Sequence, residues 1–258
     1  MSLVEYEKSG DVGRIILNRP EAGNAVDPAL IADLDTAIVA ACAKPVRALL
    51  ILARGANFSL GGDVRHLAAV GDGVAEELRS MATRFHAAQL RLCQLPVPIV
   101  AAVRGNAIGG GLGLALSADF LICTDTARFS TGYSRLGLSA DAGVSYFLTR
   151  ALGARRAASL LIDARFLSSD EALALGIADR VVPDADLDEA AERWVAELAI
   201  GPTSAFATIK RLTDEAQTNS LEHHLDREAE EIVRLAKRKD VMTAIAAIAA
   251  RAKPVFEG

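Results

Sequence analysis

The sequence predicts an α/β protein, with a mixed α/β body over residues 1–200 and an all-helical region over residues 201–258. Three observations support this fold class. Short apolar runs bounded by glycine, proline or charged residues have the length of strands and recur through the first half. Longer segments with apolar residues at helical spacing separate them and dominate the second half. A Gly201-Pro202 pair then marks the clearest boundary in the chain.

The first elements alternate between strand and helix. We expect strands at Leu3–Glu7, Val12–Leu17 and Val46–Ala53. Asp27-Pro28 predicts a helix start, because aspartate caps helices and proline suits their first position. A longer amphipathic helix is predicted over Val74–Leu95, where prolines end it.

Strands give way to helices along the rest of the chain. Further strands are predicted at Ile99–Val103, Phe120–Cys123 and Ala127–Ser130, with a helix at Leu112–Leu116. From about Ala142 the pattern is nearly all helical. The expected helices there are Val144–Leu152, a short one from Ser169, Asp186–Ala199, Pro202–Gln217, Leu221–Ala236 and Lys239–Ala252. The last has a smooth apolar face, which must pack on another surface, such as a second subunit.

Composition excludes several classes of protein. The net charge of −5 argues against broad binding to nucleic-acid backbones. No apolar run approaches the roughly 18–20 residues of a membrane span, and no secretory signal opens the chain. Cys42, Cys93 and Cys123 form no C-x-x-C pair, so we expect no metal site or disulfide framework but buried, inert thiols. A cytoplasmic protein is predicted.

Two glycine-bearing turns carry the chemistry. Gly109-Gly110-Gly111 follows a buried strand and precedes a helix, where backbone N–H groups favour negative charge. Its spacing fits neither a Walker loop nor a dinucleotide fingerprint, and close packing of helix on sheet is the alternative. Gly61-Gly62 also follows a strand. Two such turns can present two N–H donors to one oxygen, which is the layout of an oxyanion hole.

A wider set of motifs resembles the crotonase (enoyl-CoA hydratase/isomerase) superfamily over essentially the whole chain. The matching segments are Leu17-Asn18-Arg19-Pro20, Asn24-Ala25, Phe58 with Gly61-Gly62-Asp63, Gly105 with Gly109-Gly110-Gly111, Ala118-Asp119, Ala127-Arg128-Phe129, Leu136-Gly137-Leu138, Gly176-Ile177-Ala178 before Val181-Val182, and Lys253-Pro254-Val255-Phe256. The resemblance implies a spiral of ββα turns with a C-terminal helical trimerisation region, assembled as a homotrimer or a dimer of trimers.

The resemblance also implies a site for an acyl-CoA thioester. The thioester oxygen would accept hydrogen bonds from the N–H groups of Gly62 and Gly110. Coenzyme A would arrive with the substrate, so no separate cofactor is expected. The implied substrate-binding residues are Ala25, Val26, Ser59, Leu60, Gly61, Asp63, Val64, Gly109, Tyr133, Leu138, Lys253 and Phe256. Of these, Asp63 is expected to brace its turn rather than transfer protons.

Departures from the family pattern shape the expected reaction. Hydratases of this family activate water with two glutamates, whose positions are occupied here by Gly113 and Tyr133. Glycine has no proton to transfer, and a tyrosine of pKa ~10 is a poor base near neutrality. Efficient hydration by the usual route is therefore not expected.

A different carboxylate, Asp141, follows Gly137 by four residues. This arrangement resembles double-bond isomerases and the epoxyphenylacetyl-CoA ring-expanding isomerase, in which one carboxylate shuttles the proton. The simpler alternative is that Asp141 caps the helix Val144–Leu152. We predict an enoyl-CoA or ring-rearranging isomerase. The alternatives are a hydratase, a hydrolase or dehalogenase with Asp141 as nucleophile, and a non-catalytic acyl-CoA binder.

The remaining polar residues are weaker candidates. His66 is expected at the rim of the pocket, and the adjacent pair His223-His224 in solvent. His86 and Cys93 are seven apart on one predicted helix, but no third group orients them as a nucleophilic pair. Basic residues near the family's coenzyme A contacts are Arg19, Arg65, Arg251 and Lys253, each of which is otherwise a solvated charge.

Overall fold

The computed structural model describes residues 2–43 and 45–258, and its centre is a six-stranded sheet of order β1-β2-β3-β4-β6-β9. The first pair is an antiparallel hairpin and every later pair is parallel. The strands are β1 (Val4–Ser9), β2 (Val12–Leu17), β3 (Ala48–Ala53), β4 (Ile99–Val103), β6 (Phe120–Thr124) and β9 (Arg180–Val182). The carboxyl ends of the parallel strands therefore share one edge.

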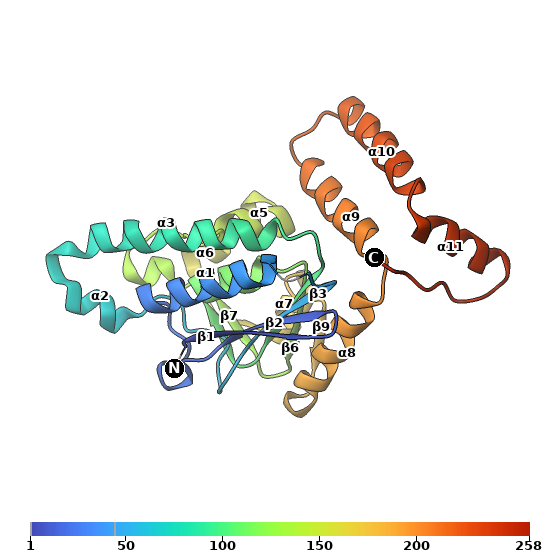
Figure 1. The fold of residues 1–258 in the computed structure, drawn as a ribbon. Helices are drawn as coiled ribbons and strands as arrows, with labels where there is room; N and C mark the ends of the chain where they lie inside the picture. Colours follow the sequence, from blue (N-terminus) through green and yellow to red (C-terminus); the bar gives the residue numbers. More distant parts are fainter. Residues whose placement is uncertain (1, 44) are drawn as a thin grey trace.

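Helices cover both faces of this sheet (Figure 1). α1 (Pro28–Ala43) and α3 (Val74–Cys93) pack on one face, and α8 (Leu187–Ala199) packs on the other. Alternate residues of β3 serve the two cores: Leu49 enters the first and Leu50 the second. Burial on both faces explains why these strands are continuously apolar.

A second, three-stranded sheet has the order β5-β7-β8. It contains β5 (Asn106–Ile108), β7 (Arg128–Ser130) and β8 (Leu167–Ser168). Each spiral turn pairs one strand of each sheet with a helix: β4, β5 and α4 (Gly110–Leu116), then β6, β7 and α5 (Val144–Leu152). The ββα spiral is thus confirmed, and its two sheets bring the segments after β3 and β5 together.

Several elements of the structure were not predicted from the sequence. α2 (Val64–Val70) and α6 (Ala154–Asp163) were not predicted, and β8 and β9 lie in the half expected to be helical. Strands of two or three residues are too short to show a period, so only their neighbours in the sheet define them. The other short elements are α7 (Ser169–Ala174) and the 3₁₀ turns η1 (Pro20–Ala22), η2 (Gly71–Gly73), η3 (Tyr133–Leu136) and η4 (Asp184–Asp186).

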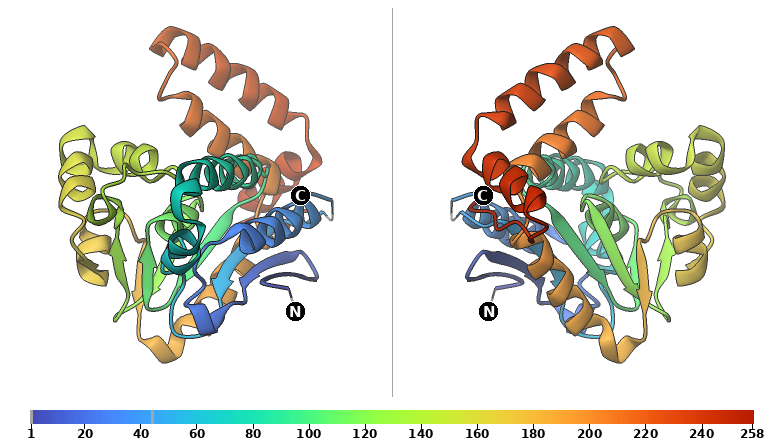
Figure 2. Two further views of the ribbon diagram at one scale, coloured as in Figure 1. Left: turned by 90° about the vertical axis from the view of Figure 1, so that its left-hand side faces the viewer. Right: turned by 90° about the vertical axis from the view of Figure 1, so that its right-hand side faces the viewer.

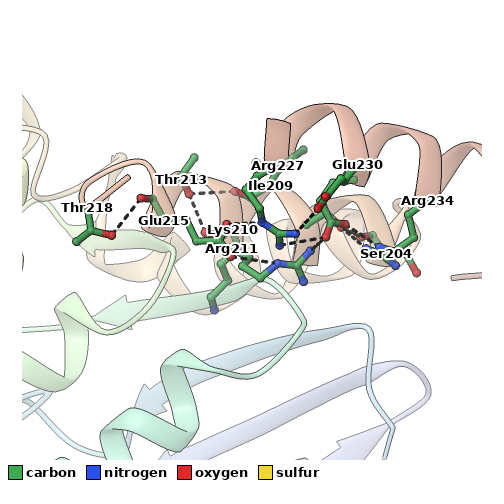
Figure 3. A network of polar contacts seen from close by, with 12 residues as sticks. Ser204, Ile209, Lys210, Arg211, Thr213, Glu215, Thr218, Arg227, Glu230 and Arg234 are labelled. Atoms are coloured by element: carbon green, nitrogen blue, oxygen red, sulfur yellow. Dashed lines mark hydrogen bonds and ion pairs between the residues drawn. The ribbon is translucent and has the colours of Figure 1, made fainter. Parts of the chain in front are cut away.

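The C-terminal helices form an arm that projects from the body (Figures 1 and 2). The arm consists of α9 (Thr203–Glu215), α10 (Leu221–Ala236) and α11 (Lys239–Ala249). Figure 3 shows the polar network between α9 and α10, in which Glu231 pairs with Arg211 at 2.6 Å and Arg234 at 2.7 Å.

Two expectations about composition can be compared with the structure. No helix among residues 2–43 and 45–258 is long and apolar enough to cross a membrane. The prediction that all three cysteines are buried is wrong, because Cys42 is exposed at the end of α1. Cys123 is buried, and burial raises the pKa of its thiol to about 12. Such a thiol is unreactive near neutrality.

Candidate active site

The Gly61-Gly62 turn follows β3 and is held by buried hydrogen bonds. The Ser59 hydroxyl donates to the Asn24 carbonyl at 2.8 Å and accepts the Gly61 N–H at 3.2 Å. Ser59 is completely buried, so its side chain builds the turn. A parallel bridge to Val26 then fixes Gly62 beside the segment that follows η1.

The two glycine turns are in direct contact. Gly61 has a φ of +82°, and a Cβ there would lie 2.7 Å from the Ile108 carbonyl oxygen and 3.6 Å from Gly109 Cα. A second bridge joins Ser59 to Ala107. Only glycine permits so close an approach with this backbone conformation. The predicted juxtaposition of the turns is therefore present.

The N–H groups of Gly62 and Gly110 have no hydrogen-bond partner in the described part of the chain. The bridge between Val26 and Gly62 uses the Val26 and Asp63 N–H groups, at 2.7 and 2.9 Å from their acceptors. It leaves the Gly62 N–H unused. Gly110 is the first residue of α4, where N–H groups have no intrahelical acceptor. Both are available to a negatively charged oxygen.

Asp63 braces this site, as predicted. Its carboxylate caps α2 by accepting the N–H groups of Arg65 and His66, and its other oxygen pairs with Arg19 at 2.9 Å. Burial alone would raise the pKa of Asp63, but the His66 and Arg19 hydrogen bonds outweigh it and lower that pKa. The same guanidinium also bonds to Asp27 at 3.2 Å, so Arg19 is committed to this brace.

Asp141 and Tyr133 form the polar centre of the site. The Tyr133 hydroxyl donates a hydrogen bond to Asp141 Oδ1. A Cβ on Gly109 would lie 3.7 Å from the Tyr133 ring, so this pair is beside the second glycine turn. Burial, followed by the charge of Asp141, raises the pKa of Tyr133. Its phenol therefore remains a hydrogen-bond donor throughout the neutral range, and Asp141 is the acceptor of the pair.

The alternative role of Asp141 as a helix cap is wrong. α5 begins after Gly143, and no side chain caps its first turn. The intervening Ala142 has a left-handed φ of +50° and is almost fully buried. Its N–H donates to His86 Nε2 at 3.0 Å, and its carbonyl accepts from Gln89 at 2.9 Å. Asp141 thus belongs to a turn held from α3.

Ala142 also occupies the space beside Gly113. A Cβ on Gly113 would lie 2.7 Å from Ala142 Cβ and would overlap the Ala142 carbonyl. Real Cβ atoms do not approach backbone so closely. Glycine is therefore required at position 113 while the Asp141 turn has this conformation, and no carboxylate can replace it there.

The other predicted binding residues are divided between two regions. Ala25 and Val26 are buried against the first turn, and Leu60, Val64 and Leu138 are exposed. Phe256 is elsewhere: its carbonyl accepts a hydrogen bond from Arg47, just before β3 begins. The glycine turns follow the opposite end of that strand, about 20 Å away for six residues. Within one chain, the tail with Lys253 and Phe256 therefore does not join the site.

The histidines have distinct partners. His66 pairs with Glu77 on α3 at 2.6 Å, and His86 contacts the Asp141 turn rather than Cys93. Cys93 instead contacts the Ser117 carbonyl at 3.8 Å. The prediction that His224 lies in solvent is wrong, because its side chain is only 15% exposed.

Sequence reasoning missed the roles of His86 and Gln89. The available signal was a glutamine on the buried face of α3, next to Phe85 and Ala88. A polar side chain there must find buried partners. No group of histidine, cysteine or acidic side chains in residues 2–43 and 45–258 is arranged to hold a metal ion. A hollow of about 570 Å³ with mixed charges lies between β9 and α8 and includes none of the candidate site residues.

The chain is similar to known proteins over nearly its whole length. The enoyl-CoA hydratase/isomerase family matches residues 7–258. The 1,2-epoxyphenylacetyl-CoA isomerase of Escherichia coli (strain K12) is 34% identical over 95% of this chain and 94% of its own. The 4-chlorobenzoyl coenzyme A dehalogenase-2 of Arthrobacter sp is 32% identical over 89% of this chain and 84% of its own. An enoyl-CoA hydratase structure from Polaromonas sp. JS666 has a TM-score of 0.93 and 30% identity, covering 98% and 99% of the two chains.

Proposed function

This chain belongs to the enoyl-CoA hydratase/isomerase family, and we propose that within it the chain is an acyl-CoA isomerase with a single catalytic carboxylate, Asp141. The observation that carries the proposal is the hydrogen bond between Tyr133 and Asp141 beside the Gly110 turn. Relatives are named for isomerase, dehalogenase and hydratase reactions, so the family alone leaves the reaction open.

The first step is activation of the thioester. Its carbonyl oxygen accepts hydrogen bonds from the free N–H groups of Gly62 and Gly110. Negative charge that develops on this oxygen is stabilised by donors already held in place by the protein, which avoids reorganisation during the reaction. The C–H bond that is lost on forming the enolate becomes more acidic as a result.

Asp141 then moves the proton. Its carboxylate removes a proton from the acidified carbon, and the electron pair of that C–H bond passes into the enolate. The protonated Asp141 returns the proton to a different carbon, which shifts the double bond and regenerates the carboxylate. Tyr133 keeps its own proton and orients the base. One carboxylate is sufficient for this cycle.

Hydration is disfavoured by the same geometry. It requires a group that activates water and a group that protonates carbon. The position of one family glutamate is Gly113, which Ala142 leaves no room to enlarge. The other is Tyr133, whose hydroxyl is already bonded to Asp141. We therefore propose isomerisation rather than the hydration for which the Polaromonas protein is named.

A second candidate uses Asp141 as a nucleophile, as in dehalogenases that place an aspartate at this offset. Its carboxylate would attack an activated aryl carbon and displace halide, giving an aryl ester that water must hydrolyse. The similarity to the Arthrobacter dehalogenase favours keeping this candidate. Mass spectrometry after rapid quenching distinguishes the two, because only the nucleophilic route leaves an adduct on Asp141.

The test of the proposal is a substrate screen. trans-3-Hexenoyl-CoA, trans-2-hexenoyl-CoA, an epoxidised phenylacetyl-CoA and 4-chlorobenzoyl-CoA are incubated separately, and products are identified by mass spectrometry and NMR. We expect isomerisation of a 3-enoyl or epoxy-aryl thioester with little addition of water. Rapid hydration of the 2-enoyl thioester would overturn the proposal. Thioester binding with no turnover would indicate a non-catalytic binder.

A further inference from the structure

The Asp141 turn is anchored from α3 by the side chains of His86 and Gln89. We propose that His86, on α3, is a positioning residue that holds Asp141 in its working orientation. The inference rests on the proposed function, since it assumes that Asp141 is the base. It follows from Ala142, the residue after Asp141, whose N–H and carbonyl are both hydrogen-bonded to α3 side chains.

The Ala142 backbone is unfavourable by itself. A φ of +50° is costly for a residue with a Cβ, and glycine or asparagine usually occupies such positions. Ala142 keeps this conformation while its exposure is only 1%. Surrounding contacts must therefore hold it, because an unsupported left-handed alanine would relax to another region.

Two side chains provide that support. His86 Nε2 accepts the Ala142 N–H at 3.0 Å, and Gln89 Nε2 donates to the Ala142 carbonyl at 2.9 Å. Because a backbone N–H can only donate, Nε2 of His86 must be the unprotonated nitrogen and the ring is neutral. Loss of this acceptor would leave a buried N–H without a partner, so the turn would shift to satisfy it.

A substitution of His86 tests the positioning role more selectively than a substitution of Gln89 would. Gln89 also bonds to the Gly113 carbonyl at 3.0 Å and the Ser117 hydroxyl at 2.6 Å, so changing it disturbs α4. The His86 side chain makes no other hydrogen bond or ion pair in the described residues. Since its Nε2 lone pair is occupied by Ala142, His86 acts on the reaction through Asp141 and not by taking a proton itself.

The experiment compares two replacements of His86. Glutamine places an amide oxygen near the former Nε2 and retains an acceptor, whereas leucine has similar bulk without one. We expect His86→Leu to reduce kcat for trans-3-hexenoyl-CoA isomerisation by about 10- to 100-fold, since a misplacement of about 1 Å costs on the order of 10². KM should change by less than about threefold, because Gly62 and Gly110 are unaffected. His86→Gln should remain within about threefold of the parent.

A readout independent of turnover accompanies the kinetics. Amide hydrogen exchange at Ala142 should accelerate in His86→Leu and return toward the parent rate in His86→Gln. Cys93→Ala is the matched control on the same helix, since Cys93 contacts Ser117 and not the turn. It should leave both kcat and Ala142 exchange unchanged.

The outcomes separate this inference from the proposed function. Full turnover in Asp141→Asn would overturn the function itself. An inactive Asp141→Asn together with a fully active His86→Leu would overturn only the positioning role. Equal losses in His86→Leu and His86→Gln, or unchanged Ala142 exchange in His86→Leu, would also overturn it, because the acceptor would then not be what matters.

Discussion

At the scale of single residues, the proposed mechanism depends on one carboxylate and two backbone donors that different parts of the chain bring together. Asp141 is bonded to Tyr133, and Tyr133 lies against Gly109. Each of these contacts predicts the effect of a particular substitution. Changes that remove one chemical group while preserving volume are the most informative.

Asp141→Asn removes the base while keeping the shape of the side chain. Isomerisation and exchange of the substrate's acidic C–H with deuterated water should fall together by roughly 10²–10⁴, as expected when general acid–base catalysis is lost. Thioester binding, measured by calorimetry, should persist. Ser139→Ala changes an exposed neighbour in the same segment and serves as the control. A variant that retains both rates would remove Asp141 from the mechanism.

Gly110→Pro removes one oxyanion donor. Because Gly110 is the first residue of α4, proline is tolerated there without breaking the helix. Turnover should fall by about 10²–10³, the usual loss for one such donor. Gly110→Ala keeps the N–H, and its Cβ would lie 4.0 Å from Ala142 Cβ, an ordinary contact. It should therefore retain most activity, and equal loss in both variants would contradict the role of the N–H.

Substitution of Gly113 by a larger residue is expected to destabilise the protein for steric reasons. Gly113→Ala forces a Cβ against Ala142, so we expect a loss of stability of about 1–3 kcal/mol together with reduced turnover. Thermal unfolding and isomerisation rates test this. Gly62→Ala is the control for thermal unfolding, because a Cβ there meets nothing within 4 Å. By the same argument, Gly113→Glu combined with Tyr133→Glu should not create a hydratase, and rapid hydration by that variant would show that the turn moves easily.

At the scale of elements, helices position this site and also form the arm. α3 holds the Asp141 turn, and α4 presents Gly110 at its first residue. In the arm, Glu231 on α10 pairs with Arg211 of α9 and with Arg234 of its own helix, within the polar network of Figure 3. Because of this ion-pair network, we expect the stability of the arm to depend on pH, which apolar packing alone would not cause.

Glu231→Gln should loosen the α9–α10 pair. The hydrogen bond from Arg234 is the largest cause that lowers the pKa of Glu231 below its ordinary 4.5, and Arg211 lowers it further. The ionised form is thus favoured by folding, so its stabilisation is present above pH 4.5 and is lost as the pH falls through the lowered value.

We expect the variant to unfold a few degrees lower than the parent at pH 7, and this difference to disappear as the pH falls below the lowered pKa of Glu231. Glu230→Gln provides the control, since Glu230 is mostly exposed and Arg227 is its one ion-pair partner among the described residues. Equal unfolding temperatures of Glu231→Gln and the parent at pH 7 would show that the network contributes no stability.

At the scale of the whole molecule, the arm is the least self-sufficient region. The only buried residues of its three helices are polar: Thr208, Glu231 and Asp240. Large apolar side chains face outward instead, namely Ile209, Leu221, Leu225, Ile232, Val233, Met242, Ile245 and Ile248. So large an exposed apolar surface is unusual for a monomer.

We therefore predict self-association through the arm into a trimer or a multiple of three, as the family resemblance implies. Sedimentation velocity at micromolar concentration should show no monomer. Ile232→Glu combined with Ile245→Glu should dissociate the assembly, because it would bury unpaired charges. A parent protein that sediments as a monomer or a dimer would contradict the prediction.

Local pattern was sufficient to predict much of this protein. The apolar strands Val12–Leu17 and Ile99–Val103, the start of α1 at Asp27-Pro28 and the glycine turns after two strands all follow from residue types within a few positions. Their common reason is that burial on both faces, capping and positive φ each demand particular residues locally. Asp141 was found by resemblance to a family, and not by local pattern.

Only the tertiary structure decided which groups meet. It placed Gly61 against Ile108, Tyr133 on Asp141, and Ala142 between His86 and Gly113. It also placed Phe256 at the far end of β3 from the glycine turns. These contacts join residues 8 to 209 positions apart in the chain. Local propensity carries no information about such pairs, because each depends on how two sheets and the helices between them pack in three dimensions.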